Sequence, residues 1–176
     1  MQQELQLIEP ITGPDIALWS CHFICKEPYT GPATPWHEFS AFWERACRRL
    51  REHVTVWLAL DRSSRENGCM RVVPGSHRNG FLQYYEVDRA SNAFAREIVQ
   101  VDDSTAVDVE LGPDECSLHD ARIIHGAAAN TSSHRRCGYK MRYMPATTLM
   151  VAEKNPGHKL WLARERPQAA NRYENA

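Results

Sequence analysis

Several features that mark other protein classes are absent from this sequence of 176 residues. It contains no run of 18 apolar residues, which excludes a membrane-spanning helix. The formal net charge is -1, and this balance favours neither nucleic acid nor a membrane surface as a partner. The first residues, Met1 to Glu9, are polar and lack the apolar core of a signal peptide. We therefore expect a cytoplasmic protein without a membrane or nucleic-acid partner.

Cysteine pairs typical of zinc sites are absent as well. No two cysteines are separated by only two residues, which is the spacing of a zinc ribbon. Disulfides are rare in the cytosol. We therefore expect reduced thiols at all six positions, which are Cys21, Cys25, Cys47, Cys69, Cys116 and Cys137.

The sequence does contain a series of short apolar segments, rich in β-branched and aromatic residues and separated by turn residues. The predicted strands are 16–25, 53–60, 69–73, 106–111, 115–125 and 137–144. This pattern predicts an all-β fold with minor helices, in which two sheets form a double-stranded β-helix, also called a jelly roll or cupin-like fold. We assign residues 1–150 to this domain and residues 151–176 to a C-terminal tail, of which the polar residues 156–176 are predicted to be loose.

Two stretches lack a strand pattern. Residues 41–50 are predicted to form a helical turn or a charged loop, and their basic residues are more typical of a solvated face than of a nucleic-acid patch. Residues 80–105 are polar and irregular, which favours a long surface insertion.

Two histidines stand out in this framework, His37 and His125. Two histidines and one carboxylate on one face, with open positions opposite, hold iron in non-heme Fe(II) oxygenases. A histidine and a carboxylate at positions i and i+2 of a strand supply two of these ligands, because both side chains point the same way. Here the i+2 residue is Phe39. Glu38 is expected to leave the opposite face of the strand.

Five sequence blocks surround these histidines in a fixed order. They are Pro-Trp-His-Glu-Phe-Ser-Ala-Phe-Trp (35–43), Thr-Val-Trp-Leu-Ala-Leu (55–60), Glu-Asn-Gly-Cys-Met (66–70), Pro-Gly-Ser-His (74–77) and Ile-His-Gly (124–126). Together they resemble the phytanoyl-CoA dioxygenase family of Fe(II)/2-oxoglutarate-dependent oxygenases. The resemblance covers about residues 5–148.

The resemblance implies a role for several residues. His37 and His125 match the two iron ligands of the family. Arg136, eleven positions after His125, matches the arginine that holds the far carboxylate of 2-oxoglutarate, a task that suits its planar fork. Trp57 and His22 match positions beside this cosubstrate. From the residues alone, Arg136 also fits a surface arginine and Trp57 a core tryptophan.

The implied activity is hydroxylation of a small organic substrate, with Fe(II) and 2-oxoglutarate as cofactors. Phe39 departs from the family pattern because a phenyl ring cannot bind a metal ion. The alternative is therefore a catalytically inactive homologue that acts as a binding or scaffold domain. A cupin-type small-molecule binder is a third possibility with the same fold. The chain is also expected to lack a segment that family members carry before the first block, which would expose a sheet edge.

Overall fold

The computed structural model describes residues 2–39, 52–79, 83–86, 96–98, 100–151, 156–164 and 171–173. The predictions for residues 41–50 lie outside this part of the chain. The elements are α1 (Gln2–Thr12), β1 (Ile16–Lys26), β2 (Thr34–His37), β3 (Val54–Ala59), β4 (Met70–Val72), the 3-10 turn η2 (Ser76–Arg78), β5 (Tyr84–Glu86), β6 (Arg96–Ile98), the 3-10 turn η3 (Asp103–Thr105), β7 (Val107–Val109), β8 (Cys116–Asp120), β9 (His125–Ala127), β10 (Arg136–Pro145) and β11 (Trp161–Arg164).

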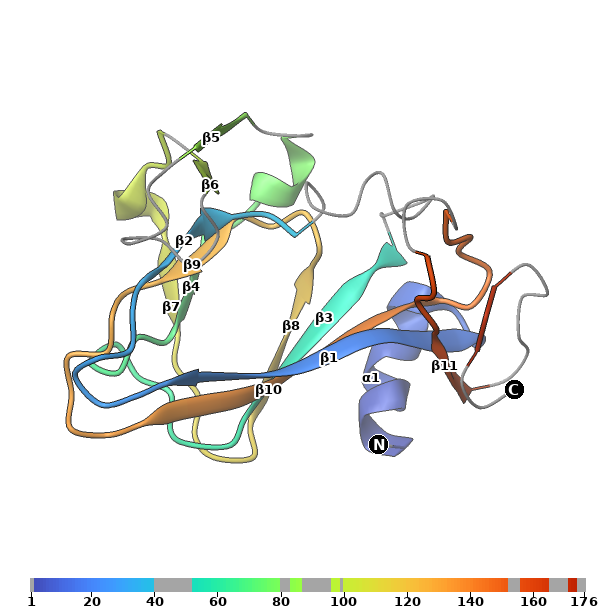
Figure 1. The fold of residues 1–176 in the computed structure, drawn as a ribbon, viewed down its shortest axis with the longest axis horizontal. Coiled ribbons are helices and arrows are strands. Elements are labelled where there is room, and N and C mark those ends of the chain that lie inside the picture. The colour runs from blue at the N-terminus through green and yellow to red at the C-terminus, as the bar shows by residue number, and fades with distance from the viewer. Residues whose placement is uncertain are drawn as a thin grey trace.

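Two antiparallel sheets dominate the structure. The large sheet has the order β11-β1-β10-β3-β8, and the small sheet has the order β2-β9-β4-β7. Figure 1 shows the small sheet facing one end of the long β1 and β10 strands. Consecutive strands of the chain repeatedly change sheet, as in a double-stranded β-helix. The predicted jelly roll with minor helices is therefore confirmed.

The two faces of the large sheet have different environments because side chains alternate along each strand. On one face, α1 buries Leu5 and Ile8 against a cluster that includes Val54 and Tyr143. The helix ends at Thr12 and is followed by Gly13, whose positive φ of 82° lets its N–H bond back to the Glu9 carbonyl at 2.8 Å. The opposite face of the same sheet turns toward the small sheet and carries the polar side chains described below.

The predicted strand 115–125 is divided in the structure, and this prediction was wrong. β8 ends at Asp120 in the large sheet, and β9 begins at His125 in the small sheet. The Asp120 carboxylate accepts bonds from the Arg122 backbone N–H at 2.8 Å and from its guanidinium at 2.6 and 2.9 Å. These short-range bonds favour a turn over a continued strand.

The surface insertion predicted for residues 80–105 has regular structure in its described part. β5 and β6 form a two-stranded sheet, and η3 follows them. The Tyr84 hydroxyl of β5 donates to the Glu38 carbonyl at 2.9 Å and accepts from its N–H at 2.7 Å. The insertion is thereby bound to the residue that follows β2.

A loose tail was also predicted for residues 156–176, and this is wrong for the part that forms β11. Trp161 and Leu162 pair with Leu18 and Ala17 of β1. Leu160, just before β11, is buried with 1% exposure. These residues belong to the large sheet, while the division of the chain at residue 150 stays a prediction.

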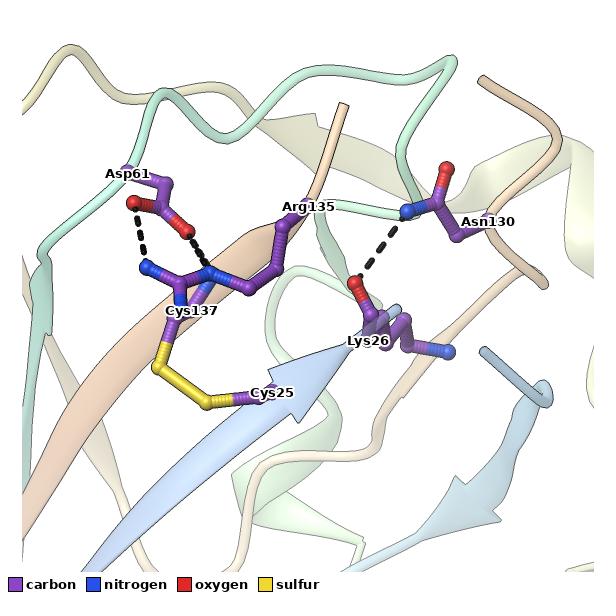
Figure 2. Close-up of a disulfide and its surroundings, with 6 residues drawn as sticks. All are labelled: Cys25, Lys26, Asp61, Asn130, Arg135 and Cys137. Carbon is purple, nitrogen blue, oxygen red and sulfur yellow. Dashed lines mark hydrogen bonds and ion pairs between the residues drawn. A yellow bond between two sulfur atoms is a disulfide. The ribbon is translucent and has the colours of Figure 1, made fainter. Parts of the chain in front are cut away.

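The expectation of six reduced thiols is contradicted by a disulfide between Cys25 and Cys137 (Figure 2). The two residues are direct partners in the β1–β10 ladder, and their Cα atoms lie 4.1 Å apart. They are separated by 112 positions in the sequence, so only the register of the two strands brings them together. Cys21, Cys69 and Cys116 are free thiols.

Polar contacts support the same end of β1 and β10 (Figure 2). The Asp61 carboxylate accepts bonds from the guanidinium of Arg135 at 2.8 and 3.2 Å and from the Cys137 N–H at 3.0 Å. The Asn130 amide donates to the Lys26 carbonyl at 3.2 Å. These bonds fix the ends of the two strands where Lys26 and Arg136 enter the space between the sheets.

Candidate cofactor site between the sheets

A cavity of about 270 Å³ lies between the large and small sheets. Its polar lining consists mainly of basic side chains, which are Lys26, His37, His119, His125, Arg136 and Lys140. The indole of Trp57 and the side chains of Ile24 and Met70 add apolar surface. No aspartate or glutamate is among the described residues that line it. The cavity is therefore small and lined mainly by basic side chains, with no described carboxylate.

The small sheet contributes His37 from β2 and His125 from β9. They are direct partners across the two strands, and their ring centroids are 4.1 Å apart. The Nδ1 of His37 bonds to the Pro35 carbonyl at 2.8 Å, and the Nδ1 of His125 bonds to the Ile123 carbonyl at 2.9 Å. Because a carbonyl only accepts, both Nδ1 atoms are donors and both Nε2 atoms carry the lone pair. This tautomer is the one that binds a metal through Nε2.

Both imidazoles are held in the neutral form by their surroundings. Burial lowers the pKa of His125 to about 4. Burial also lowers the pKa of His37 well below its ordinary value, and the neighbouring His125 adds to this effect. The predicted convergence of His37 and His125 is present in the structure, whereas the prediction that Phe39 occupies the third-ligand position beside them is wrong.

His119 is a third histidine in the cavity, and its ring centroid lies 5.1 Å from that of His125. It comes from β8 of the large sheet and faces His125 from across the cavity. The sequence pattern had placed the two on one strand with the same orientation. Within the described residues, no three histidine, cysteine, aspartate or glutamate side chains are arranged to hold a metal ion.

Phe39 lies outside the cavity lining. It is buried in a core cluster with Trp19, at a centroid distance of 5.5 Å. The Arg142 guanidinium covers its ring, with Cζ 3.4 Å from the ring centroid. β2 ends at His37, so the strand alternation that would aim residue 39 beside His37 stops before it. An apolar ring then gains more from the core than from a cationic cavity.

Glu38 does not replace the missing carboxylate. It is fully buried but is not part of the cavity lining. Hydrogen bonding to Asp120 raises the pKa of Arg122, and the charge of Glu38 raises it further. The Glu38 carboxylate therefore interacts electrostatically with Arg122 and not with a ligand in the cavity.

Arg136 enters the cavity from the start of β10. It is buried with 3% exposure, and its Nε has no hydrogen-bond partner within the described structure. Its guanidinium Cζ lies 5.2 Å from the centroid of the Trp57 ring, a cation–π distance. The indole itself lies over Gly138, where a Cβ atom would come within 2.1 Å of it. Trp57 thus positions Arg136, and both predicted residues line the cavity.

His22 is the predicted site residue that the structure places outside the cavity lining. It lies on β1 opposite Lys140 of β10 and is exposed. β11 pairs with β1 only as far as Leu18. No described strand therefore covers β1 on its other side at His22, which explains the exposure.

Two cations of β10 were missed by the sequence analysis. Lys140 lines the cavity, and burial together with Arg142 lowers its pKa to about 7. Burial lowers the pKa of Arg142 to about 9. The signal was present in the sequence, since Arg136, Lys140 and Arg142 occupy alternating positions of one strand.

Iron does not fit the described residues. The two imidazoles suit Fe(II), but the third ligand of a two-histidine, one-carboxylate site is missing. The nearby cations Lys140 and Arg142 already lower the pKa of both His37 and His125, although each effect is smaller than that of burial. A divalent cation at the same place would meet the same repulsion.

The fold and the paired histidines define a jelly roll of the non-heme oxygenase type, and comparison with known proteins identifies the family. Residues 4–138 match the family described as Phytanoyl-CoA dioxygenase (PhyH). The chain belongs to this family.

Individual relatives share the family over most of this chain. It is 28% identical over 145 residues to a phytanoyl-CoA dioxygenase domain-containing protein 1 homolog from Caenorhabditis elegans, covering 76% of this chain and 48% of the relative. The chain spans about half the length of the curated relatives it matches.

Solved structures agree with this assignment. The non-heme monooxygenase ThoJ in its apo form superposes with a TM-score of 0.80 at 26% identity, over 98% of this chain and 63% of ThoJ. EvdO2 from Micromonospora carbonacea var. aurantiaca, complexed with 2-oxoglutarate, gives a TM-score of 0.68 at 30% identity, over 81% of this chain and 56% of EvdO2. In the described part of this chain, no helix is both long and apolar enough to span a membrane.

Proposed function

We propose that this chain is a 2-oxoglutarate-binding domain that has kept the cosubstrate site of its family and lost the iron centre. The observation that carries the proposal is the buried Arg136, whose Nε has no described hydrogen-bond partner and whose guanidinium stands at the cavity wall. A buried guanidinium nitrogen without a hydrogen-bond partner is costly, and a carboxylate can accept two parallel hydrogen bonds from a guanidinium.

The cavity supports a small dianionic ligand in two further ways. Its volume of about 270 Å³ suits a small organic acid rather than a bulky ester. Its described lining holds Lys26, Arg136 and Lys140 and no carboxylate, so the local charge favours an anion. EvdO2, which is 30% identical, has been solved with 2-oxoglutarate.

Isothermal titration with 2-oxoglutarate tests the proposal. The wild-type chain should bind it, and Arg136→Met should weaken binding at least tenfold. Arg135→Met is the matched control, because Arg135 is the neighbouring arginine but pairs with Asp61 at the surface. Equal affinity of the wild type and Arg136→Met, or an equal loss in both variants, would refute the assignment of Arg136.

A second candidate function is the Fe(II)- and 2-oxoglutarate-dependent hydroxylation of a small organic substrate. The tautomers of His37 and His125 favour it, because both Nδ1–H groups are held by backbone carbonyls and both Nε2 atoms are prepared for a metal. This function needs a third ligand that the described residues do not supply. The test is succinate formation from 2-oxoglutarate with added Fe(II). Its absence in a protein that binds 2-oxoglutarate favours the binding domain.

We further propose a cytoplasmic location, with a small molecule as partner and neither nucleic acid nor a membrane. Disulfides such as the one between Cys25 and Cys137 are rare in that compartment, so the redox state of this pair in cells tests the proposed location. Thiol counting on protein trapped in cell extract by alkylation distinguishes the reduced pair from the disulfide.

A further inference from the structure

The strongest unexplained feature beside the cavity is a row of cations on β10, of which Arg136 and Lys140 line the cavity. Arg136, Lys140 and Arg142 share the face of the large sheet that turns toward the small sheet, since they occupy alternating strand positions. Burial lowers the pKa of each of them. Among the described residues, no ion pair joins any of the three to a carboxylate. The folded chain therefore holds positive charge that an anion would neutralise.

Not all of the nearby cations are available to a ligand. The Lys26 ammonium donates to the carbonyls of Pro32 and Ala128, and these bonds give it a structural role. Arg142 lies over the Phe39 ring and donates to the Ser20 hydroxyl at 3.1 Å. Two cations that line the cavity remain, Arg136 and Lys140.

The surface between Arg136 and Lys140 is apolar. They are four residues apart on β10, roughly 13 Å between Cα atoms, with Gly138 midway. Trp57 is the β3 partner of Lys140, and its indole covers Gly138 and reaches the Arg136 guanidinium. A flat aromatic surface with a cation at each end is complementary to a short aliphatic chain with a carboxylate at each end.

We propose that Lys140 replaces the metal as the partner of the second carboxylate, so that the cavity binds a short dicarboxylate such as 2-oxoglutarate between Arg136 and Lys140 without any metal ion. This inference rests on the proposed function for Arg136 and adds Lys140 as a determinant of ligand class. It also accounts for the missing iron ligand, because a dicarboxylate paired with Arg136 and with protonated Lys140 needs no divalent ion for charge balance.

The test is titration of the full chain with 2-oxoglutarate in excess EDTA. Binding should persist in EDTA and should change less than twofold when Mn²⁺ replaces EDTA. Lys140→Met should weaken 2-oxoglutarate binding at least tenfold, and Lys140→Arg should keep most of the wild-type affinity. The control is Lys159→Met, at an exposed lysine on the other side of β1, which should bind as tightly as the wild type. Pentanoate, with one carboxylate, should bind Lys140→Met and the wild type equally.

The outcomes separate this inference from the proposed function. If 2-oxoglutarate binds only with Mn²⁺ present and Lys140→Met has no effect, Lys140 does not replace the metal, while the proposed cosubstrate site stands. If the wild type binds no 2-oxoglutarate with or without Mn²⁺, both fail. Lys140→Met removes a buried charge, so a thermal melt should show it folded and at least as stable as the wild type. If Lys140→Met does not fold, Lys140→Gln replaces it in the titrations. Loss of pentanoate binding in either variant refutes a specific role of Lys140 at the second carboxylate.

Discussion

Phe39→Asp restores the carboxylate at the family's ligand position, and the structure predicts that it does not restore iron binding. The Arg142 guanidinium lies 3.4 Å from the centroid of the ring that would be replaced. A carboxylate introduced there meets this guanidinium first. We expect the two to form an ion pair, which leaves His37 and His125 without a third ligand.

The cost in stability can be worked out from the contacts of Phe39. Its ring is 8% exposed and packs against Trp19. Removing such a ring in Phe39→Ala should cost about 3–5 kcal/mol. In Phe39→Asp, hydrogen bonds between the new carboxylate and Arg142 should return about 1.5–3 kcal/mol. The aspartate variant should therefore be more stable than the alanine variant by about 2 kcal/mol, despite its buried charge.

Urea denaturation of both variants measures the stability difference, and calorimetric titration with Mn²⁺ measures metal affinity. Phe39→Asp should bind Mn²⁺ no better than the wild type. The double variant Phe39→Asp/Arg142→Met should bind it at least tenfold more tightly, and Phe39→Ala/Arg142→Met is the control without a carboxylate. The reasoning fails if Phe39→Asp is less stable than Phe39→Ala, or if the single variant binds Mn²⁺ as tightly as the double variant.

Three other predictions concern packing, pH and the disulfide. Gly138→Ala should cost about 1–3 kcal/mol and weaken 2-oxoglutarate binding, since its Cβ would displace the Trp57 indole; urea denaturation and titration measure both. Burial lowers the pKa of His53 to about 4, so between pH 6.5 and 4 this side chain takes up a proton only in the unfolded state. Its contribution to the free energy of unfolding should be full above pH 6.5 and fall by roughly 3 kcal/mol toward pH 4, in addition to the losses from the other buried histidines, and His53→Gln should remove this part of the loss in melts across that range. Cys25→Ser should lower the free energy of unfolding by about 2–5 kcal/mol, because Cys25 and Cys137 close a long loop, and dithiothreitol should have the same effect on the wild type but none on the variant.

The sequence predicted those site residues that lie within or at a fixed distance from the recognisable sequence blocks. His37 and His125 converge, and Arg136 and Trp57 line the same cavity, as the order of blocks implied. Phe39 could not be placed, because its orientation depends on where β2 ends. A strand that stops at His37 no longer aims the residue two positions later.

Features that depend on pairing between distant strands were beyond reach of the sequence. Cys25 meets Cys137 only through the β1–β10 register. His119 approaches His125 from the opposite sheet, because a turn at residues 121–124 divides the strand that the pattern had left continuous. Lys140 shows the intermediate case. Its alternation with Arg136 and Arg142 is visible in the sequence. The order of the strands in the two sheets was needed to show that this face of β10 lines a cavity.

The missing carboxylate and the guanidinium of Arg142 both make the surroundings of the histidine pair less favourable for a metal ion. At an effective dielectric constant of about 20, a divalent ion and a guanidinium an assumed distance of about 6 Å apart repel each other by roughly 5 kcal/mol. An aspartate ligand offsets this repulsion, whereas the Phe39 ring cannot. A dicarboxylate between Arg136 and Lys140 carries the opposite charge, so the nearby cations attract it where they repel a metal ion. Without the carboxylate, the same side chains that oppose a metal ion favour an anion, and the histidine pair alone does not decide which of the two the cavity binds.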